Sequence, residues 1–309
     1  MATWQEKLAA DEIVLIDGGM GTELERVGAQ MNARSWSGAA VIEAPDVVRR
    51  VHRGFVEAGA EVITVNTFSM APHMLRGMGY GDRIESAIAD AVRLAREACA
   101  EAGQPDLPIA GSVSTMRTKD PETGTWPDLP RDEAHESIST LVRILKEEGC
   151  SILALEMMED LDMAPMTTEI AVASGLPTWL GISCRRAADG KTIESFDVPG
   201  VTLDQLFAAL LPLGADVLNI MHSEIPVTGE ALERARPLWN KPLGAYPESG
   251  YFTMPTWNFV DIVSPADLVE EAKGWVGKGA RILGGCCGLG PDHITALRDA
   301  MPELMAARC

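Results

Sequence analysis

The chain has 309 residues, of which 46% are hydrophobic and 23% charged, so it can build a large core and is not a disordered protein. Asp and Glu number 45 against 26 Lys and Arg, which gives a formal net charge of -19. Such an acidic surface repels nucleic-acid phosphates and anionic lipid head groups. We therefore exclude nucleic acid and membranes as partners and expect small-molecule substrates.

The amino-terminal sequence predicts a cytoplasmic protein. Residues 1–19 lack the basic segment and apolar stretch of a secretory signal, and no apolar run reaches membrane-spanning length. No linker rich in Pro, Ser or Gly divides the chain, and α/β barrels commonly reach this size as one unit. We expect a single domain over residues 1–309, and the sequence leaves its oligomeric state open.

Short runs rich in Val, Ile and Leu alternate with longer segments of helical periodicity along the whole chain. The predicted strands are residues 12–18, 61–67, 108–114, 151–156, 177–184, 216–222, 242–248 and 280–286. The predicted helices are residues 45–58, 82–102, 131–148, 160–174, 203–213, 229–239, 264–276 and 291–301. This order predicts an α/β fold, a (β/α)8 TIM barrel. An open doubly wound sheet is the alternative, although no G-x-G-x-x-G motif follows the first strand.

Polar and metal-capable residues follow the carboxyl ends of the predicted strands, where active sites of such barrels lie. They are Asp17 to Gly19, Asn66 and Thr67, Ser112 to Ser114, Glu156, Ser183 and Cys184, Asn219 to His222, Tyr246 to Glu248, and Gly285 to Gly288. Two longer connections, residues 115–130 and 248–264, contain Trp126 and Trp257 and are expected to cover this rim as lids.

Cys286 and Cys287 are adjacent, lie between glycines and end the eighth predicted strand. Six cysteines in a chain of this length do not form the dense framework of a disulfide protein, and a disulfide between neighbours is strained. Two such thiolates can bind one zinc ion, which would activate a substrate thiol bound in an open position. Two small core residues or a redox pair are the alternatives.

The motifs at both ends of the chain resemble the homocysteine S-methyltransferase family. Residues 17–25 (DGGMGTELE) are similar to the family's first strand and turn, and residues 57–60 and 64–68 to its second unit. Residues 284–293 (GGCCGLGPDH) are similar to its closing zinc motif. The resemblance implies a zinc ion held by three cysteines, which activates homocysteine to accept a methyl group from an onium or methylfolate-type donor.

By position, the resemblance implies that Cys286 and Cys287 bind zinc, that Glu156 receives the homocysteine amino group, and that Asp17 and Gly18 also contact the amino acid. A solvated or ion-paired rim carboxylate is the alternative for Glu156, and a turn cap is the alternative for Asp17.

One family ligand is replaced in this chain. The family's first zinc cysteine follows an Asn near the end of the sixth strand, and the corresponding pair here is Asn219 and Ile220. Strand alternation would place His222 on the same face as residue 220, so we expect His222 to complete a Cys2His zinc site. A hydrogen-bonded rim role for His222, Cys184 as the third ligand, or no metal stay open.

Further departures surround the same region: Met157 replaces a Thr, Glu248 an Asn and Leu289 a Thr. The leading hypothesis is a zinc-dependent S-methyltransferase that moves a methyl group from a sulfonium or quaternary ammonium donor to homocysteine, giving methionine. Trp126, Trp257 or Tyr251 would then stabilise the methyl donor's cation. A divergent barrel demethylase with another acceptor and a non-catalytic amino-acid-binding protein are the alternatives.

Overall fold

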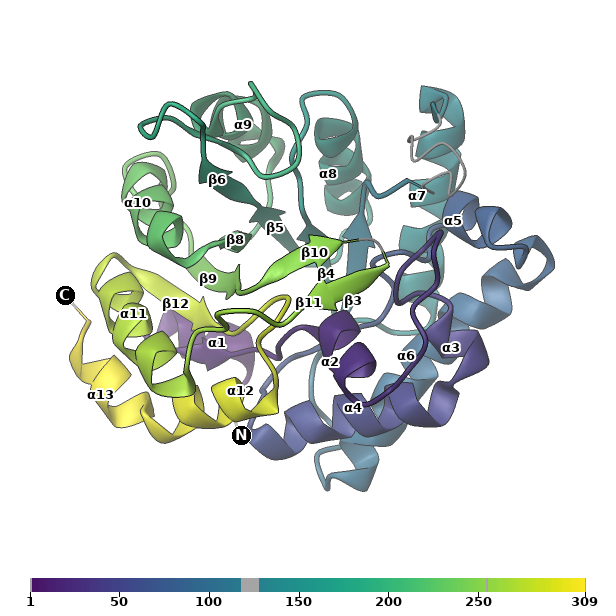
Figure 1. Ribbon diagram of the computed structural model, residues 1–309, viewed down its shortest axis with the longest axis horizontal. Helices are drawn as coiled ribbons and strands as arrows, with labels where there is room; N and C mark the ends of the chain where they lie inside the picture. Colours follow the sequence, from purple (N-terminus) through teal and green to yellow (C-terminus); the bar gives the residue numbers. More distant parts are fainter. Residues whose placement is uncertain (1, 118–127, 254, 309) are drawn as a thin grey trace.

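The computed structural model shows eight parallel strands curled into a barrel (Figure 1), and it describes residues 2–117, 128–253 and 255–308. The strands follow the order β1-β12-β9-β8-β5-β4-β3-β2, and a parallel bridge between Ile16 and Val62 joins the first to the last. The (β/α)8 TIM barrel is therefore confirmed, and the open sheet is excluded. The barrel strands are β1 (Val14–Leu15), β2 (Ile63–Val65), β3 (Ile109–Ser114), β4 (Ile152–Glu156), β5 (Thr178–Ile182), β8 (Val217–Glu224), β9 (Leu243–Glu248) and β12 (Ala280–Leu283).

Helices surround the sheet, and each predicted helix is present (Figure 1). The largest error in a start is at α10, which begins at Ile225 rather than at residue 229, because Pro226 is tolerated in a first turn whose N–H groups have no helical partner. The larger helices are α4 (Pro45–Ala58), α6 (Ile84–Glu101), α7 (Arg131–Glu147), α8 (Met163–Ala173), α9 (Leu203–Leu210), α10 (Ile225–Ala235), α11 (Pro265–Gly277) and α12 (Pro291–Asp299). Short helices not predicted from the sequence are α1 (Trp4–Ala9), α2 (Met20–Arg26), α3 (Ala40–Glu43), α5 (Pro72–Gly77) and α13 (Met301–Ala306).

Alternate side chains of the strands enter two separate apolar cores. One core lies between the sheet and the helices, and the other fills the inside of the barrel. Trp4 of α1 belongs to the inner core, where its ring packs edge-on against Trp179 at a centroid distance of 5.2 Å. Because the same core includes Val14, Ile152 and Val217 from the beginnings of strands, Trp4 lies at the amino end of the barrel.

The carboxyl end carries two additional hairpins. Strands β6 (Cys184–Arg186) and β7 (Ile193–Ser195) follow β5, whereas β10 (Tyr251–Thr253) and β11 (Thr256–Asn258) follow β9. The second hairpin occupies the predicted lid of residues 248–264. Its Trp257 is buried, and the Trp257 indole N–H donates to the Ser249 carbonyl at 3.1 Å. The other predicted lid comprises residues 115–130. Its residues 118–127, including Trp126, lie outside the described residues.

No helix among the described residues is long and apolar enough to cross a membrane.

Candidate metal and substrate site

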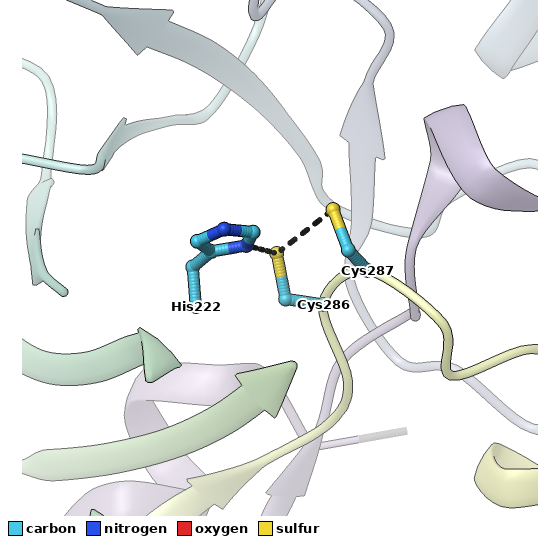
Figure 2. Close-up of side chains that lie close together, drawn as sticks. All are labelled: His222, Cys286 and Cys287. Carbon is cyan, nitrogen blue, oxygen red and sulfur yellow. Dashed lines mark hydrogen bonds between the residues drawn. The ribbon is translucent and has the colours of Figure 1, made fainter. Parts of the chain in front are cut away.

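His222, Cys286 and Cys287 meet at the carboxyl end of the barrel (Figure 2). The Cys286 Sγ lies 3.4 Å from His222 Nδ1 and 4.0 Å from Cys287 Sγ, and the three ligand atoms lie within 4.8 Å of one another. Among residues 2–117, 128–253 and 255–308, these three form the one group of His, Cys, Asp or Glu side chains that lie close enough together to hold a metal ion. Cys184 is not brought to this group: it is fully buried, with its Sγ 3.5 Å from the Ser223 Oγ.

A tight turn places both cysteines at the rim. The Cys286 N–H donates to the Pro247 carbonyl at 2.8 Å, and the Ser249 N–H donates to the Cys287 carbonyl at 2.9 Å. Gly288 follows with a φ of 82°, and a Cβ at this position would lie 1.9 Å from the Ser249 carbonyl oxygen. Only glycine satisfies both the left-handed backbone and the close approach, so Gly288 fixes the turn that presents the two thiols.

His222 reaches the cysteines by a break in its strand, not by strand alternation. Ile220 belongs to the core between sheet and helices, so residues 220 and 222 do not share a face and that expectation was wrong. His222 has a φ of 41°, and the β8–β9 pairing shifts register between Met221 and Glu224. Such an irregularity turns a side chain to a new direction. The left-handed backbone costs about 1–3 kcal/mol, which the surrounding structure must offset.

The three groups are electrostatically coupled. The hydrogen bond with Cys287 and the neighbouring imidazole hold the pKa of the Cys286 thiol well below its usual range, against the effect of burial. The hydrogen bond with Cys286 and burial raise the pKa of Cys287. Burial lowers the pKa of His222, but the negative charge of Cys286 overrides it and raises that pKa to about 9. Without a metal, the cluster therefore favours a thiolate beside an imidazolium.

The ligand set and its spacing fit zinc. Zn–S bonds of about 2.3 Å and Zn–N bonds of about 2.0 Å at tetrahedral angles separate two sulfurs by about 3.8 Å and a sulfur from a nitrogen by about 3.5 Å. The observed separations are 4.0 Å and 3.4 Å. A bound cation would displace the imidazole proton, because only a neutral nitrogen can act as a ligand.

Asp17 and Glu156 lie in the same cavity, which has a volume of about 1010 Å³. Asp17 accepts hydrogen bonds from the Thr64 N–H at 2.6 Å and the Thr64 hydroxyl at 2.9 Å. Glu156 accepts one from the Ser112 hydroxyl. Burial raises the pKa of Asp17 to about 7 and, with the nearby Cys286 charge, that of Glu156 to about 8. Neither carboxyl has an ion-pair partner in the described part of the chain, so both favour an added cation.

Gly18 also lines the cavity, and it marks a close contact between the first and last βα units. A Cβ at Gly18 would lie 2.3 Å from the Leu289 carbonyl oxygen and 2.8 Å from the Phe55 ring. The Asp17 carbonyl accepts from the Gly285 N–H at 3.1 Å. The motif near residue 17 therefore packs directly against the cysteine turn.

Glu159 and Phe196 were missed in the sequence, although both line the cavity. The Phe196 ring lies 4.9 Å from that of His222 between centroids, and Trp257 lies 6.1 Å from His222 on the same measure. Glu159 accepts from the Ser183 hydroxyl and is buried. A second acid three residues after Glu156 was a usable signal, whereas nothing in the local pattern distinguished Phe196.

Known proteins resemble this chain over most of its length. A family model described as homocysteine S-methyltransferase matches residues 14–301. Betaine–homocysteine S-methyltransferase 1 from Danio rerio is 27% identical over 98% of this chain and 76% of its own length. Selenocysteine methyltransferase from Astragalus bisulcatus is 25% identical over 93% of this chain and 92% of its own.

A solved structure of a homocysteine methyltransferase is also similar to this chain. The metallated form of the homocysteine methyltransferase MmuM from Escherichia coli has a TM-score of 0.72 and 25% identity, covering 94% of this chain and 97% of that chain. Because the family model spans nearly the whole barrel, this protein is a methyltransferase that belongs to the homocysteine S-methyltransferase family.

Proposed function

We propose that the protein is a zinc-dependent S-methyltransferase that moves a methyl group from a sulfonium or quaternary ammonium donor to homocysteine, giving methionine. The observation that carries the proposal is the presence of the His222, Cys286 and Cys287 group in one cavity with two carboxyls that form no ion pair, the buried Asp17 and the half-buried Glu156. The printed names of the relatives, which include betaine, homocysteine and selenocysteine, support this substrate class.

Asp17 and Glu156 would hold the acceptor by its ammonium group. Charge-assisted hydrogen bonds to buried carboxylates are stronger than neutral ones, and they orient the amino acid as well as bind it. The thiol would then reach the rim cysteines. His222, Cys286 and Cys287 would hold zinc, which when bound lowers the pKa of a ligated thiol and so supplies a thiolate at neutral pH. The thiol proton passes to solvent.

The aromatic side chains would face the methyl donor. Trp257 and Phe196 lie around His222, and Tyr251 lines the cavity with 54% of its surface exposed. Aromatic faces attract sulfonium and ammonium cations. In transfer, a bond forms between the acceptor sulfur and the methyl carbon while the bond from that carbon to the donor heteroatom breaks. The electron pair stays on the heteroatom, which becomes neutral, so alignment and exclusion of water supply most of the acceleration.

The test combines metal analysis with a transfer assay. We expect the purified protein to contain one zinc per chain and to convert homocysteine to methionine with S-methylmethionine or glycine betaine, measured by mass spectrometry. The C286S variant should lose both zinc and turnover. Activity that persists after complete metal removal would contradict the mechanism. Donor demethylation without homocysteine would favour the demethylase instead, and ligand-induced thermal stabilisation without turnover would favour a binding protein.

A further inference from the structure

Glu248 is a buried acid that the proposed transfer does not use. It ends β9, lines the cavity and is only 7% exposed. Its Oε2 is buried without a hydrogen-bond partner. Buried charges in proteins are paired or lie beside metals, because leaving one alone costs several kcal/mol. A positive group nearby would therefore be needed to keep Glu248 in its charged form.

The charges around Glu248 identify that group. His222 is the cationic side chain that acts on Glu248, whereas Cys286 and Glu224 act on it as negative neighbours. No Lys or Arg forms an ion pair with Glu248 in the structure as far as it is described. The charged neighbours of Glu248 are thus two members of the metal group and Glu224, and no surface cation.

Backbone contacts place Glu248 close to both His222 and the turn that contains Cys286 and Cys287. Glu224 pairs with Glu248 just after the register shift that turns His222 inward. The residues on either side of Glu248 bond to the cysteine turn, through Pro247 to Cys286 and through Ser249 to Cys287. This arrangement fixes the carboxyl near the ligands without making it one of them, since the close group contains only His222 and the two cysteines.

The net charge of the proposed zinc site suggests a role for Glu248. Two thiolates neutralise a divalent cation and the imidazole adds no charge, so the proposed ligand set is electrically neutral before the substrate binds. We propose that Glu248 is a positioning residue of the metal site, whose carboxylate supplies one further negative charge beside His222, orients the imidazole and strengthens binding of a divalent cation. This inference rests on the proposed function, because it takes His222, Cys286 and Cys287 as the ligands.

The experiment compares E248Q, E248D and D162N. Asp162 is a matched control because it lines the same cavity but is exposed and paired with Arg131. The zinc affinity of each protein is measured by competition with a chromophoric chelator. We expect E248Q to bind zinc about 10–100-fold more weakly, as is typical for loss of an outer partner of a metal ligand. E248D should recover most of the affinity, and D162N should match the wild type.

Two further measurements separate the outcomes. The absorption bands of the cobalt-substituted protein should shift in E248Q but not in D162N, because the imidazole loses its orientation. Thermal melting of the metal-free variants shows whether they are folded. Equal zinc affinity in folded E248Q and wild type, or equal weakening in E248Q and D162N, would overturn the inference alone. Failure of the wild type to bind zinc would instead overturn the proposed function as well.

Discussion

Replacing Glu159 by Gln should remove a loss of stability that the metal-free protein suffers as the pH rises. Glu159 is 6% exposed, and burial and the nearby Asp197 raise its pKa from 4.5 to about 8. The folded protein thus binds this proton more tightly than the unfolded chain does. The resulting stability is fully present below pH 4.5 and is lost as the pH rises through about 8.

The size of the effect follows from the same values. At about 1.4 kcal/mol per pKa unit, the difference between 4.5 and about 8 corresponds to about 5 kcal/mol of unfolding free energy. Gln keeps an oxygen for the Ser183 hydroxyl but loses the bond from the Asp197 N–H, which costs about 1 kcal/mol at every pH. E159Q should therefore be slightly less stable than the wild type near pH 5 and several kcal/mol more stable above pH 8.

Urea unfolding of both metal-free proteins, followed by circular dichroism across this pH range, measures the difference. D162N serves as the control, since the Asp162 carboxyl is exposed. The reasoning is refuted if the difference in unfolding free energy between E159Q and the wild type stays constant with pH, or if D162N shows the same trend.

Other substitutions test the metal ligands, the packing and the acceptor site. H222A should weaken zinc binding on the order of 100-fold or more by chelator competition, whereas C184A should not change it; equal effects would remove His222 from the ligand set. G18A should lower the unfolding free energy by about 1–3 kcal/mol, because its Cβ would overlap the Leu289 carbonyl; an unchanged melting temperature would contradict that contact. E156Q should raise the KM for homocysteine about 10–100-fold and leave that for the methyl donor unchanged, in steady-state kinetics; an equal rise in both would exclude a specific ammonium contact.

The barrel was predictable because parallel strands are buried on both faces. Their sequences are continuous apolar runs rich in Val, Ile and Leu, as in residues 152–155, and the helices between them have a clear apolar face. The hairpins β6–β7 and β10–β11 were not predicted, since strands of three residues have no measurable period. The start of α10 was misplaced because Gly229 resembled a boundary, whereas Pro226 marks the first turn.

The site was only partly predictable. The pairing of glycines with Cys286 and Cys287 identified the turn, and the nearness of His222 was expected for a reason that the structure contradicts. A positive φ at one residue depends on contacts from neighbouring strands, which no periodicity records. The same holds for Glu159 and Glu248, since the burial of a carboxyl is a property of the assembled barrel and not of the local sequence.

The position of Trp4 bears on the order in which the two substrates bind. Since its indole packs inside the amino end of the barrel and the cavity lies at the opposite end, the two proposed reactants would both enter from that opposite end. A compound held by Asp17 and Glu156, as proposed, would lie deeper than one that rests beneath the exposed ring of Tyr251. We therefore expect a sequential kinetic scheme in which the amino acid arrives first and its methylated product departs last.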